Sequence, residues 1–501
     1  MIRLSDISYR YPGEASGWIL KNLNLKIHEG EYVLLCGGSG SGKSTLGYLL
    51  NGLIPHFFDG TLKGTVSVNG RDTLNLTVGD LLETVGLVFQ NPDAQLFNGS
   101  VAGEIAFGLE SLGRLPNEID QQINRVAETL HIKHLLERSP SALSGGEKRL
   151  VAIASVLCLN PPFLVLDEPL SHLDWEGARR VQTALKDLHR TGKTIVVIEQ
   201  RVGAVLGDVD RCIVLDHGTV LFDGIPTSVE PVLRKVHLLP DYQARGERMR
   251  PSREPILSAK DINFTVDGDR RILDGVSVNV QQGEILSIVG RNGSGKTTLV
   301  KNLNGLLQPD QGKVLLMGEE LRGMSPPDIA VRVGVAFQNP NDQFFKNSVK
   351  DELLIGLKLA KEAPADWFAE VCTLFDMHAL LNQSPYRLSE GQKKRLGVAS
   401  VVVMQPRILI LDEPTVGQDG RFRESLAALL LSLQAKGFTV VIVTHDLEFA
   451  LATSERWIVM HEGRIVEIGT PQSLVRNEAL IRMGALGKEN GASMGGLADG
   501  N

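Results

Sequence analysis

The chain contains one sequence twice, and this internal repeat restricts the fold more than any other feature. KNLNLKIHEGEYVLLCGGSGSGKSTL in the first half corresponds to DGVSVNVQQGEILSIVGRNGSGKTTL in the second. ALSGGEKRLVAIASVLCLNPPFLVLDEP likewise corresponds to RLSEGQKKRLGVASVVVMQPRILILDEP. Lys43 pairs with Lys296, 253 positions later, and Asp167 pairs with Asp412, 245 positions later. Because this period is far longer than a solenoid repeat, it predicts two duplicated domains.

Composition indicates where the two domains begin and end. We predict a first domain over residues 1–242, a linker over 243–255, a second domain over 256–486 and a tail over 487–501. The linker sequence QARGERMRPSREP is polar, charged and interrupted by prolines, as connecting segments are. The tail GKENGASMGGLADGN is rich in glycine and poor in apolar residues, so we expect it to be disordered.

Within each half, short apolar runs alternate with helical stretches. Runs such as EYVLLCG, FLVLDEP and TIVVIEQ are bounded by turn residues, which is typical of buried parallel strands in an α/β layer. Residues 102–160 and 350–405 have a more helical pattern and interrupt the series of strands. We therefore expect a helical subdomain inserted into an α/β core in each half.

Composition also argues against several classes of partner. The 52 Lys and Arg residues are outnumbered by 59 Asp and Glu, so we expect no nucleic-acid partner. The four cysteines lie far apart, which argues against a disulfide framework or a zinc site. The longest apolar stretches are broken by polar residues, whereas a membrane span needs ~20 predominantly apolar residues. MIRLSDISYRYPG has polar residues where a signal peptide needs an apolar core, so a cytosolic chain is expected.

Two glycine-rich segments, GGSGSGKS and GRNGSGKT, match the pattern GxxxxGK[ST] of a phosphate-binding loop. Each follows an apolar strand and precedes a predicted helix, so that backbone N–H groups and a helix N-terminus face the phosphates. We expect Lys43 and Lys296 to reach the β- and γ-phosphates of ATP, and Ser44 and Thr297 to supply oxygen ligands for Mg²⁺. The alternative is a glycine-rich turn with an incidental lysine, and two copies in the same context argue against it. The ATP-binding residues predicted in the loops are Gly37, Gly38, Ser39, Gly40, Ser41, Gly42, Lys43, Ser44 and Thr45, and Gly290, Arg291, Asn292, Gly293, Ser294, Gly295, Lys296, Thr297 and Thr298.

Each half also has an apolar strand that ends in Asp-Glu, in FLVLDEP and ILILDEP. The first acid, Asp167 or Asp412, is expected to hold Mg²⁺. The second, Glu168 or Glu413, is expected to orient or deprotonate an attacking water. A strand-end acidic pair alone is more often a helix cap or a turn, but two phosphate-binding loops upstream argue against that reading.

Two further segments complete the pattern. LSGGE (143–147) and LSEGQ (388–392), here called the signature segments, place a serine at a helix start where it can bind an anion. An ordinary N-cap is the alternative. FQNP (89–92 and 337–340), here called the Q turns, carries an amide that can reach the metal-bound water. The predicted ATP-binding residues of these segments are Ser144, Gly145, Gly146, Glu147, Ser389, Glu390, Gly391, Gln392, Gln90 and Gln338, and the two glutamines are also predicted metal ligands.

Phosphate-binding loop, Q turn, signature segment, LDEP and VTHD, in this order and spacing, resemble the ABC ATPases over nearly the whole of both halves. The resemblance implies an α/β fold in which each half has a RecA-like core, a helical subdomain and an antiparallel β portion. It also implies that the two halves pair head to tail, so that the phosphate-binding loop of each half faces the signature segment of the other.

The sequence after Gln90, NPDAQLFNGSVAGEIAFGLESLG, is similar to ATPases of energy-coupling-factor importers, and the second half keeps its outline. This resemblance implies an importer for a vitamin, such as a thiamine-related one, or for a transition-metal ion. It implies a place at the cytoplasmic face of the cell membrane and two integral-membrane partners, a scaffold and a substrate-binding subunit. In the family, the region after the Q turn receives helices of a membrane subunit. Asp93, Asp342 and Glu104 would meet basic residues there, and a solvated acidic surface is the alternative.

Three other functions remain open. A tandem sugar-importer ATPase has similar length and motifs, but the NPDAQLF and NPNDQFF segments argue against it. A tandem ABC protein that acts on ribosomes or DNA usually has a long charged linker or basic arms, which this acidic chain lacks. A regulatory module without turnover is disfavoured because Glu168 and Glu413 are both present.

The halves differ at two positions that the resemblance assigns to catalysis. VIEQR aligns with IVTHD, so Gln200 stands where His445 stands. The family uses this histidine to contact the γ-phosphate and the attacking water, whereas a glutamine amide carries neither a proton nor a charge. Glu390 replaces the usual glycine of the segment that would face the Gln200 site, and its carboxylate would repel a polyphosphate. We therefore expect the Glu413–His445 site to perform most of the turnover. Alternatively, Gln200 substitutes adequately and Glu390 turns into solvent.

The sequence also predicts unequal binding of adenine. The resemblance assigns base stacking to Tyr11, whose counterpart is Val266, while Phe264 matches Tyr9 and is expected in the core. Stacking on an aromatic ring contributes ~1–3 kcal/mol per base. Tyr11→Ala should therefore weaken nucleotide binding, and Val266→Ala should not. Titration of each variant with a fluorescent nucleotide tests this, and equal losses of affinity would contradict the assignment.

Overall fold

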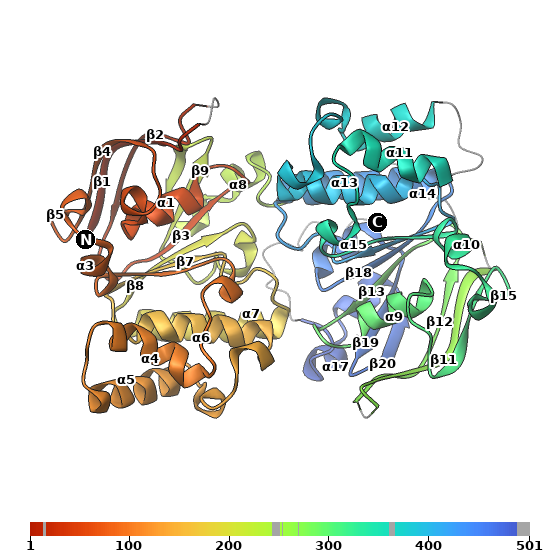
Figure 1. The fold of residues 1–501 in the computed structure, drawn as a ribbon, viewed down its shortest axis with the longest axis horizontal. Coiled ribbons are helices and arrows are strands. Elements are labelled where there is room, and N and C mark those ends of the chain that lie inside the picture. The colour runs from red at the N-terminus through yellow and green to blue at the C-terminus, as the bar shows by residue number, and fades with distance from the viewer. Residues whose placement is uncertain (14–16, 243–250, 253, 269, 360–365, 488–501) are drawn as a thin grey trace. The chain divides into compact units, whose positions relative to one another are not determined.

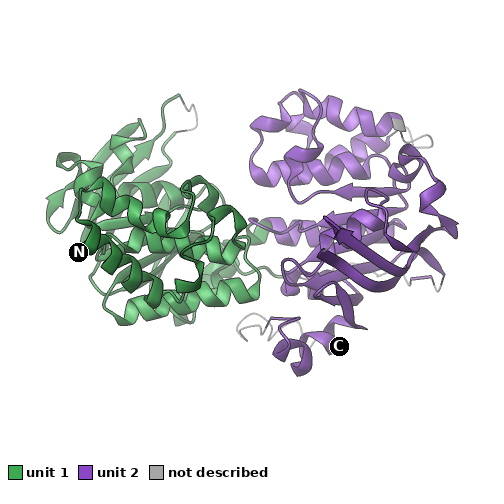
Figure 2. Cartoon of the chain, turned by 60° about the horizontal axis from the view of Figure 1, so that its bottom comes forward, with its two compact units in different colours: residues 1–241, 419–421 green, residues 242–418, 422–501 purple. Residues whose placement is uncertain are grey.

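The computed structural model describes residues 1–13, 17–242, 251–252, 254–268, 270–359 and 366–487. The chain forms two compact units, which comprise residues 1–241 with 419–421 and residues 242–418 with 422–501 (Figure 2). Most of the predicted linker, residues 243–250 and 253, lies outside the described residues, as do residues 488–501 of the predicted tail.

The first unit contains two sheets, and the larger one carries the predicted site. A four-stranded antiparallel sheet has the order β2-β1-β4-β5. A six-stranded sheet has the order β10-β9-β3-β8-β7-β6, in which only β10 runs antiparallel to its neighbour. The strands are β1 Ile2–Arg10, β2 Leu20–Ile27, β3 Tyr32–Gly37, β4 Thr61–Val68, β5 Arg71–Asp72, β6 Val85–Val88, β7 Phe163–Asp167, β8 Thr194–Glu199, β9 Arg211–Asp216 and β10 Thr219–Gly224. The helices are α1 Lys43–Leu50, α2 Leu53–His56, α3 Val78–Leu82, α4 Val101–Ser111, α5 Pro116–Thr129, α6 Gly145–Leu157, α7 Trp175–Arg190 and α8 Glu230–Lys235.

The second unit repeats this plan. Its four-stranded sheet has the order β12-β11-β14-β15, and its six-stranded sheet has the order β16-β17-β18-β13-β19-β20. The strands are β11 Pro255–Val266, β12 Arg270–Gln281, β13 Ile285–Gly290, β14 Gln311–Leu316, β15 Glu319–Glu320, β16 Val333–Ala336, β17 Ile408–Asp412, β18 Thr439–Thr444, β19 Arg456–His461 and β20 Arg464–Gly469. The helices are α9 Lys296–Leu303, α10 Pro326–Ala330, α11 Val349–Leu359, α12 Trp367–Leu374, α13 Glu390–Val402, α14 Gly420–Ala435, α15 Leu447–Thr453, α16 Pro471–Val475 and α17 Glu478–Arg482.

Strand composition explains why the large sheets are buried. Every residue of β3, β7 and β8 is buried, as is every residue of β13, β17 and β18. Strands that are apolar on both faces need cover on both sides, which parallel sheets obtain from helices. In Figure 1, α4, α5 and α6 pack together at one end of the first unit, away from β1, β2 and β4. The predicted α/β core with a helical subdomain and an antiparallel sheet is therefore confirmed in each half.

The order of the strands brings the predicted motifs to one edge of each large sheet. β8 lies between β3, which leads into the phosphate-binding loop, and β7, which ends at Asp167. In the second unit β18 lies in the same way between β13 and β17. The carboxyl ends of these parallel strands therefore meet, as they do at ligand sites of open α/β sheets. Among the described residues, no helix is both long and apolar enough to cross a membrane.

A glycine in each unit lets the helix that starts at the signature segment lie close to the six-stranded sheet. These helices, α6 and α13, are here called the signature helices. A Cβ on Gly86 would lie 2.2 Å from Val156 Cγ1, and a Cβ on Gly334 would lie 2.2 Å from Val401 Cγ1. These distances are far below van der Waals contact, so α6 and α13 approach β6 and β16 only because no side chain intervenes.

Substituting this glycine should therefore destabilise the second unit. Gly334→Ala should lower the free energy of unfolding by about 1–3 kcal/mol through overpacking, as urea unfolding can measure. Adding Val401→Ala removes the methyl group that clashes and should recover part of the loss. Gly323→Ala is the matched control, because a Cβ there meets no atom within 4 Å. Equal losses for Gly334→Ala and Gly323→Ala would contradict the packing argument.

Candidate functional site

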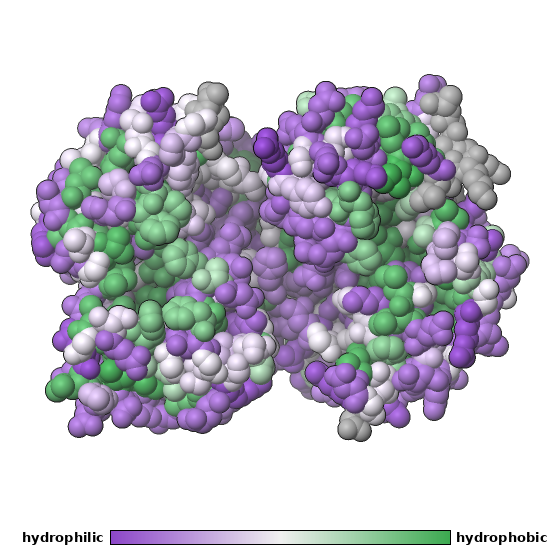
Figure 3. All heavy atoms as spheres, viewed as in Figure 1, coloured by the Kyte–Doolittle hydropathy of each residue, from purple (hydrophilic) through white to green (hydrophobic). Residues whose placement is uncertain are grey.

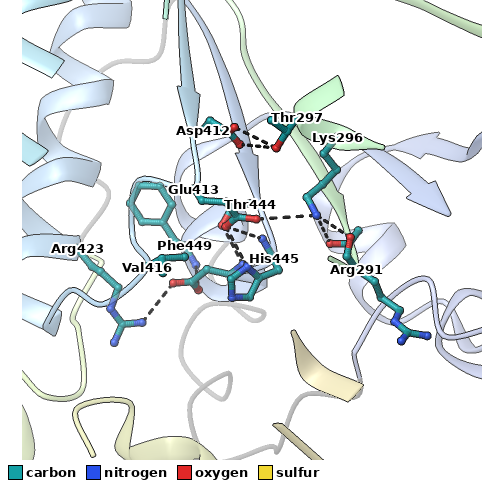
Figure 4. A network of polar contacts seen from close by, with 12 residues as sticks. Arg291, Lys296, Thr297, Asp412, Glu413, Val416, Arg423, Thr444, His445 and Phe449 are labelled. Atoms are coloured by element: carbon teal, nitrogen blue, oxygen red, sulfur yellow. Dashed lines mark hydrogen bonds and ion pairs between the residues drawn. The ribbon is translucent and has the colours of Figure 1, made fainter. Parts of the chain in front are cut away.

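Both phosphate-binding loops hold their lysines inside the loop. Lys43 Nζ donates hydrogen bonds to the carbonyl oxygens of Gly37 and Gly38, both at 2.9 Å. Lys296 Nζ donates to the carbonyls of Gly290 and Arg291, both at 2.8 Å (Figure 4). Both lysines are buried, and burial lowers the pKa of Lys43 despite the nearby carboxylates. A phosphate oxygen can replace these carbonyls as the partner of each ammonium group, and the contact of the two lysines with ATP stays a prediction.

The hydroxyl after each lysine lies against the first acid of the acidic strand. Thr297 Oγ1 donates to Asp412 Oδ2 at 3.0 Å. Burial raises the pKa of Asp412 to about 6, and the hydrogen bond from Thr297 opposes this rise. In the first unit burial raises the pKa of Asp167, and Ser44 opposes the rise in the same way. Paired hydroxyl and carboxylate oxygens suit Mg²⁺, which prefers oxygen ligands, so these four residues have the chemistry that the ion requires, while metal binding by Gln90 and Gln338 stays a prediction.

In the second unit the second acid lies beside a histidine. Glu413 Oε2 lies 2.9 Å from Nδ1 of His445 and accepts a hydrogen bond from the His445 amide at 3.3 Å. Glu413 Oε1 lies 3.9 Å from Lys296 Nζ (Figure 4). Burial raises the pKa of Glu413, but the opposing effects of His445 and Lys296 are together larger. The net pKa lies below the ordinary value, so Glu413 is held as a carboxylate.

In the first unit two amides occupy the corresponding space. The side-chain amides of Gln90 and Gln200 donate hydrogen bonds to the two carboxylate oxygens of Glu168, Gln90 at 2.8 Å. Burial and the neighbouring Asp167 carboxylate raise the pKa of Glu168, and the contacts with Lys43 and the amides offset this only in part. The structure thus brings Gln90, Gln200 and Glu168 together. Gln90 and the equivalent Gln338 are both exposed, so exposure does not distinguish the two Q turns.

Both glutamates have an unusual backbone conformation. Glu168 has φ 46° and Glu413 has φ 49°, in the left-handed region that non-glycine residues seldom adopt. Such strain persists only where surrounding contacts impose it, and it is concentrated at functional sites. The conformation turns the side chain of each glutamate from the strand end toward the residue that follows the neighbouring strand.

The signature segments form equivalent helix starts. Ser144 Oγ accepts from the Glu147 amide, and the Glu147 carboxylate accepts from the Ser144 amide at 2.8 Å. Ser389 and Gln392 form the same reciprocal pair at the start of α13. Both serines are therefore N-caps, which was the alternative reading. An N-cap still presents the first backbone N–H groups of its helix to an anion.

The side chain of Glu390 is exposed to solvent, which is the alternative to the predicted repulsion of a polyphosphate. Its side chain is 66% exposed, and Oε1 lies 2.9 Å from Lys393 Nζ on the same helix. The lysine offsets its charge, so electrostatic repulsion of a polyphosphate by Glu390 is weaker than the sequence suggests. Of the two predicted differences between the sites, the replacement of His445 by Gln200 carries more weight.

The predicted adenine contact lies over the first phosphate-binding loop. Tyr11 OH lies 3.3 Å from Thr45 Oγ1, and its ring meets the buried Tyr9 edge to face at 5.0 Å. Val266 is exposed at the end of β11, and Phe264 packs against the core of its sheet. Tyr11 thus lies beside the first phosphate-binding loop, and base stacking on its ring stays a prediction.

One predicted contact with a partner is wrong. Glu104 is only 3% exposed, and its carboxylate accepts hydrogen bonds from the backbone and the side-chain amide of Asn98. A carboxylate used in this way is not available to a basic residue of another protein. Asp93 is exposed but forms an ion pair with Lys148 at 2.6 Å, and Asp342 is also exposed.

Two buried residues and one half-buried residue beside the sites were not singled out from the sequence. Arg149 and Lys394 stand at equivalent places in α6 and α13, and Glu199 ends β8. Burial and the nearby Glu168 carboxylate raise the pKa of Glu199 to about 8. The available signal was the alignment of the halves, in which Arg149 pairs with Lys394 and Glu199 with Thr444.

Comparison with known proteins agrees with this geometry. The family model described as ABC transporter matches residues 20–171 and 273–416, which include both phosphate-binding loops and both acidic strands. A protein of Caldanaerobacter subterraneus subsp. tengcongensis is 32% identical, with 95% of this chain and 92% of that protein covered. A Vibrio vulnificus protein is 34% identical, with 96% and 92% covered. Both are named as ABC transporter ATP-binding proteins.

Solved structures also resemble the chain over nearly its full length. The archaeal ribosome recycling factor aABCE1, solved with the ribosomal stalk protein aP1, has a TM-score of 0.68 and 23% identity. The match covers 95% of this chain and 92% of that one. The structure named RNase-L Inhibitor has a TM-score of 0.67 and 23% identity, with 96% and 93% covered. At this identity the likeness shows the fold.

The different partners of the two glutamates predict unequal sites. Glu413→Gln should remove most of the steady-state ATP hydrolysis at neutral pH, whereas Glu168→Gln should leave most of it. The two variants should also differ in pH dependence. As the pH falls, Glu168 takes up its proton before Glu413, because the pKa of Glu168 is raised and that of Glu413 is lowered. The residual activity of Glu413→Gln should therefore decline at a higher pH than that of Glu168→Gln.

ATPase assays of the purified full-length variants between pH 5 and pH 8 measure both effects. Gly323→Ala serves as a control for losses of activity during purification, because Gly323 lies on an open surface. If the two substitutions cause equal losses of ATP hydrolysis, and if the residual activities decline at the same acidic pH, the sites are equivalent.

Proposed function

The chain belongs to the ABC transporter family, and from this membership we propose that it energises a membrane importer of the energy-coupling-factor type. Both halves are ATP-binding ATPase domains, with the predicted two-domain ABC fold. The proposal adds that Mg²⁺ accompanies ATP, that the chain lies at the cytoplasmic face of the cell membrane, and that a scaffold and a substrate-binding subunit are its membrane partners. The cargo is a vitamin, such as a thiamine-related one, or a transition-metal ion.

The observation that carries this proposal is an exposed phenylalanine after each Q turn. Phe97 is 66% exposed and Phe345 is 78% exposed. The two residues stand at equivalent positions, because QLF in the first half aligns with QFF in the second. Scattered exposed apolar residues are normal, but the same large apolar side chain exposed at the same place in both halves is typical of a docking surface used twice.

A buried carboxylate holds each of these loops in place. Glu104 accepts from the amide of Asn98, the residue after Phe97. Glu352 accepts from the amides of Phe345 and Lys346 at 2.9 and 2.8 Å. Charge-assisted hydrogen bonds of this kind are the stronger ones in proteins. The glutamates therefore fix the backbone beneath each phenylalanine, and the side chain is presented to a partner without prior ordering of the loop.

Further apolar side chains extend the surface of the first unit. Phe107 of α4 is 45% exposed and packs edge to face on Phe97 at 4.8 Å between ring centres. In the space-filling view, apolar side chains gather over the middle of the first unit, between the positions of α1 and α4 (Figure 3). Asp93 of the same segment is 65% exposed although it pairs with Lys148, so an apolar helix with a basic residue is the partner that this chemistry suits.

The proposed cycle assigns distinct tasks to residues of the chain. The phosphate-binding loops bind ATP, and Lys43 and Lys296 exchange their loop carbonyls for phosphate oxygens. Mg²⁺, held by Thr297 and Asp412 or by Ser44 and Asp167, would offset phosphate charge. Glu413, oriented by His445, accepts a proton from the attacking water. We propose that the halves pair head to tail around two ATP molecules and that hydrolysis releases them, which moves the membrane partners.

The relatives favour transport over a role on ribosomes. The two bacterial proteins match nearly the whole chain at 32% and 34% identity and are named for transport. The likeness to the ribosome recycling factor, at 23% identity, extends to the fold alone. The acidic net charge of −7 also argues against binding to RNA.

Affinity purification from detergent-solubilised membranes tests the proposal. The tagged wild-type chain should recover two integral-membrane proteins, and the double variant Phe97→Ala with Phe345→Ala should lose them while it still binds ATP. Ile225→Ala with Met317→Ala is the matched control, because these side chains are also large, apolar and exposed. Recovery of ribosomes in place of membrane proteins, or undiminished recovery by the phenylalanine variant, would overturn the proposal.

A further inference from the structure

Equivalent basic residues in the two signature helices contact different parts of the two sites. Arg149 and Lys394 each lie five residues after the N-cap serine of α6 or α13, and Arg149 is buried whereas Lys394 is half-buried. Replacement of arginine by lysine conserves the charge but not the geometry, because a guanidinium is a planar fork and an ammonium is a point donor.

In the first unit the arginine holds the Q turn. Arg149 is 2% exposed, and its two terminal nitrogens donate to the carbonyl oxygens of Phe89 and Gln90, both at 2.7 Å. The loop after Glu168 is held from another element, because Glu199 at the end of β8 accepts from the Leu170 amide at 2.8 Å. In this unit α6 is thus tied to the Q turn, and β8 is tied to the loop that carries the glutamate.

In the second unit the lysine holds the glutamate itself. Lys394 Nζ donates to the backbone carbonyl of Glu413 at 3.2 Å and to that of Val416 at 2.9 Å. The carboxyl group that performs this task in the first unit has no counterpart, since Thr444 replaces Glu199. α13 is therefore tied directly to the segment that carries the catalytic carboxylate.

A cavity lies on the side of Lys394 that faces the Q turn. Its volume is about 10 Å³, room for one water molecule at most. It is lined by Phe337 and Pro340 of the Q turn, by Lys394 of α13, and by Asp412, Pro414 and Phe422. The guanidinium of Arg149 reaches the Q turn of the first unit, whereas both hydrogen bonds of Lys394 go to the loop after Asp412 and leave this space unfilled.

We propose that Lys394 is a positioning residue that couples the signature helix to the backbone of Glu413, and that this coupling exists in the second unit alone. Glu413 has a left-handed backbone that its surroundings must impose, and the donation from Lys394 to its carbonyl is one such restraint. A shift of α13 would move the catalytic carboxylate, whereas a shift of α6 would move the Q turn.

The charge balance around Lys394 supports this role. Burial lowers the pKa of Lys394 to about 8, while the carboxylates of Glu413, Glu390 and Asp412 oppose the decrease. The side chain thus remains mostly cationic near neutral pH and donates strong hydrogen bonds to both carbonyls. The inference rests on hydrolysis at Glu413, as in the proposed function, but not on the identity of the membrane partners.

Steady-state ATPase kinetics of the full-length chain test the inference. Lys394→Met keeps the length of the side chain but removes both hydrogen bonds. A displacement near 1 Å at a catalytic group lowers rates by up to ~100-fold, so we expect kcat to fall at least ~10-fold and KM for ATP to change less than ~2-fold. Lys436→Met is the matched control, because Lys436 is exposed and pairs with Glu370 at the surface. Thermal unfolding midpoints establish that each variant is folded.

Lys394→Arg changes the geometry of the hydrogen-bond donors but keeps the positive charge. It also tests the inference if Lys394→Met does not fold. An arginine at this place holds the Q turn in the first unit, so we expect Lys394→Arg to lower kcat although its charge is retained. A wild-type kcat for either variant would overturn the inference. Glu413→Gln in the same assay distinguishes the two levels of argument. If Glu413→Gln leaves hydrolysis intact, the proposed site itself is wrong. If Glu413→Gln abolishes hydrolysis while Lys394→Met is unaffected, only the coupling is wrong.

Discussion

Two carboxylates buried next to one another at the end of a strand are the constraint around which each unit is organised. Burial disfavours the charged form of both groups, and one carboxylate of each pair also raises the pKa of its neighbour, Asp167 that of Glu168 and Glu413 that of Asp412. Only a nearby cation and well-placed donors offset that cost. The buried lysine, the hydroxyl beside the first acid and the donors around the second acid are arranged accordingly. The strand order brings them together, because the phosphate-binding strand and the acidic strand flank one common neighbour.

The two units satisfy this constraint by different means. The second unit uses His445 and Lys296 close to Glu413, and the carboxyl group stays ionised. The first unit has Lys43 where the second has Lys296, but it has a neutral amide in place of His445, and its two amides donate hydrogen bonds to Glu168 without lowering its pKa to the ordinary value. A carboxylate whose pKa is raised is a stronger base but is less often ionised. A carboxylate whose pKa is lowered is a weaker base, but it is ionised at neutral pH. The difference between the sites is thus already present in each unit before nucleotide binds.

The sequence predicts the fold and the local motifs well, because strand burial and loop chemistry follow from residues that are neighbours in the chain. The α/β plan and the helical subdomains are of this kind, whereas the approach of Thr297 to Asp412, which are far apart in the chain, was expected from the resemblance to a family. The role of Glu104 was wrong because its exposure depends on how α4 packs, which no local pattern records. The direction of Glu390 was left open for the same reason. The contacts of Arg149 and Lys394 were missed because a basic residue in a helix is usually on the surface, and only tertiary structure shows Arg149 to be buried and Lys394 to be half-buried.

The distribution of Arg149, Glu199, Lys394 and Thr444 has a consequence for the history of the duplicated gene. Exchange of sequence between the halves by gene conversion would bring Glu199 into a unit that has Lys394, or Thr444 into a unit that has Arg149. The first exchange adds a carboxyl group to a buried site that already has two, and the second leaves the Leu170 amide without its acceptor. Transfer of only one member of such a pair therefore costs the receiving half a buried contact, which disfavours partial exchange between the halves.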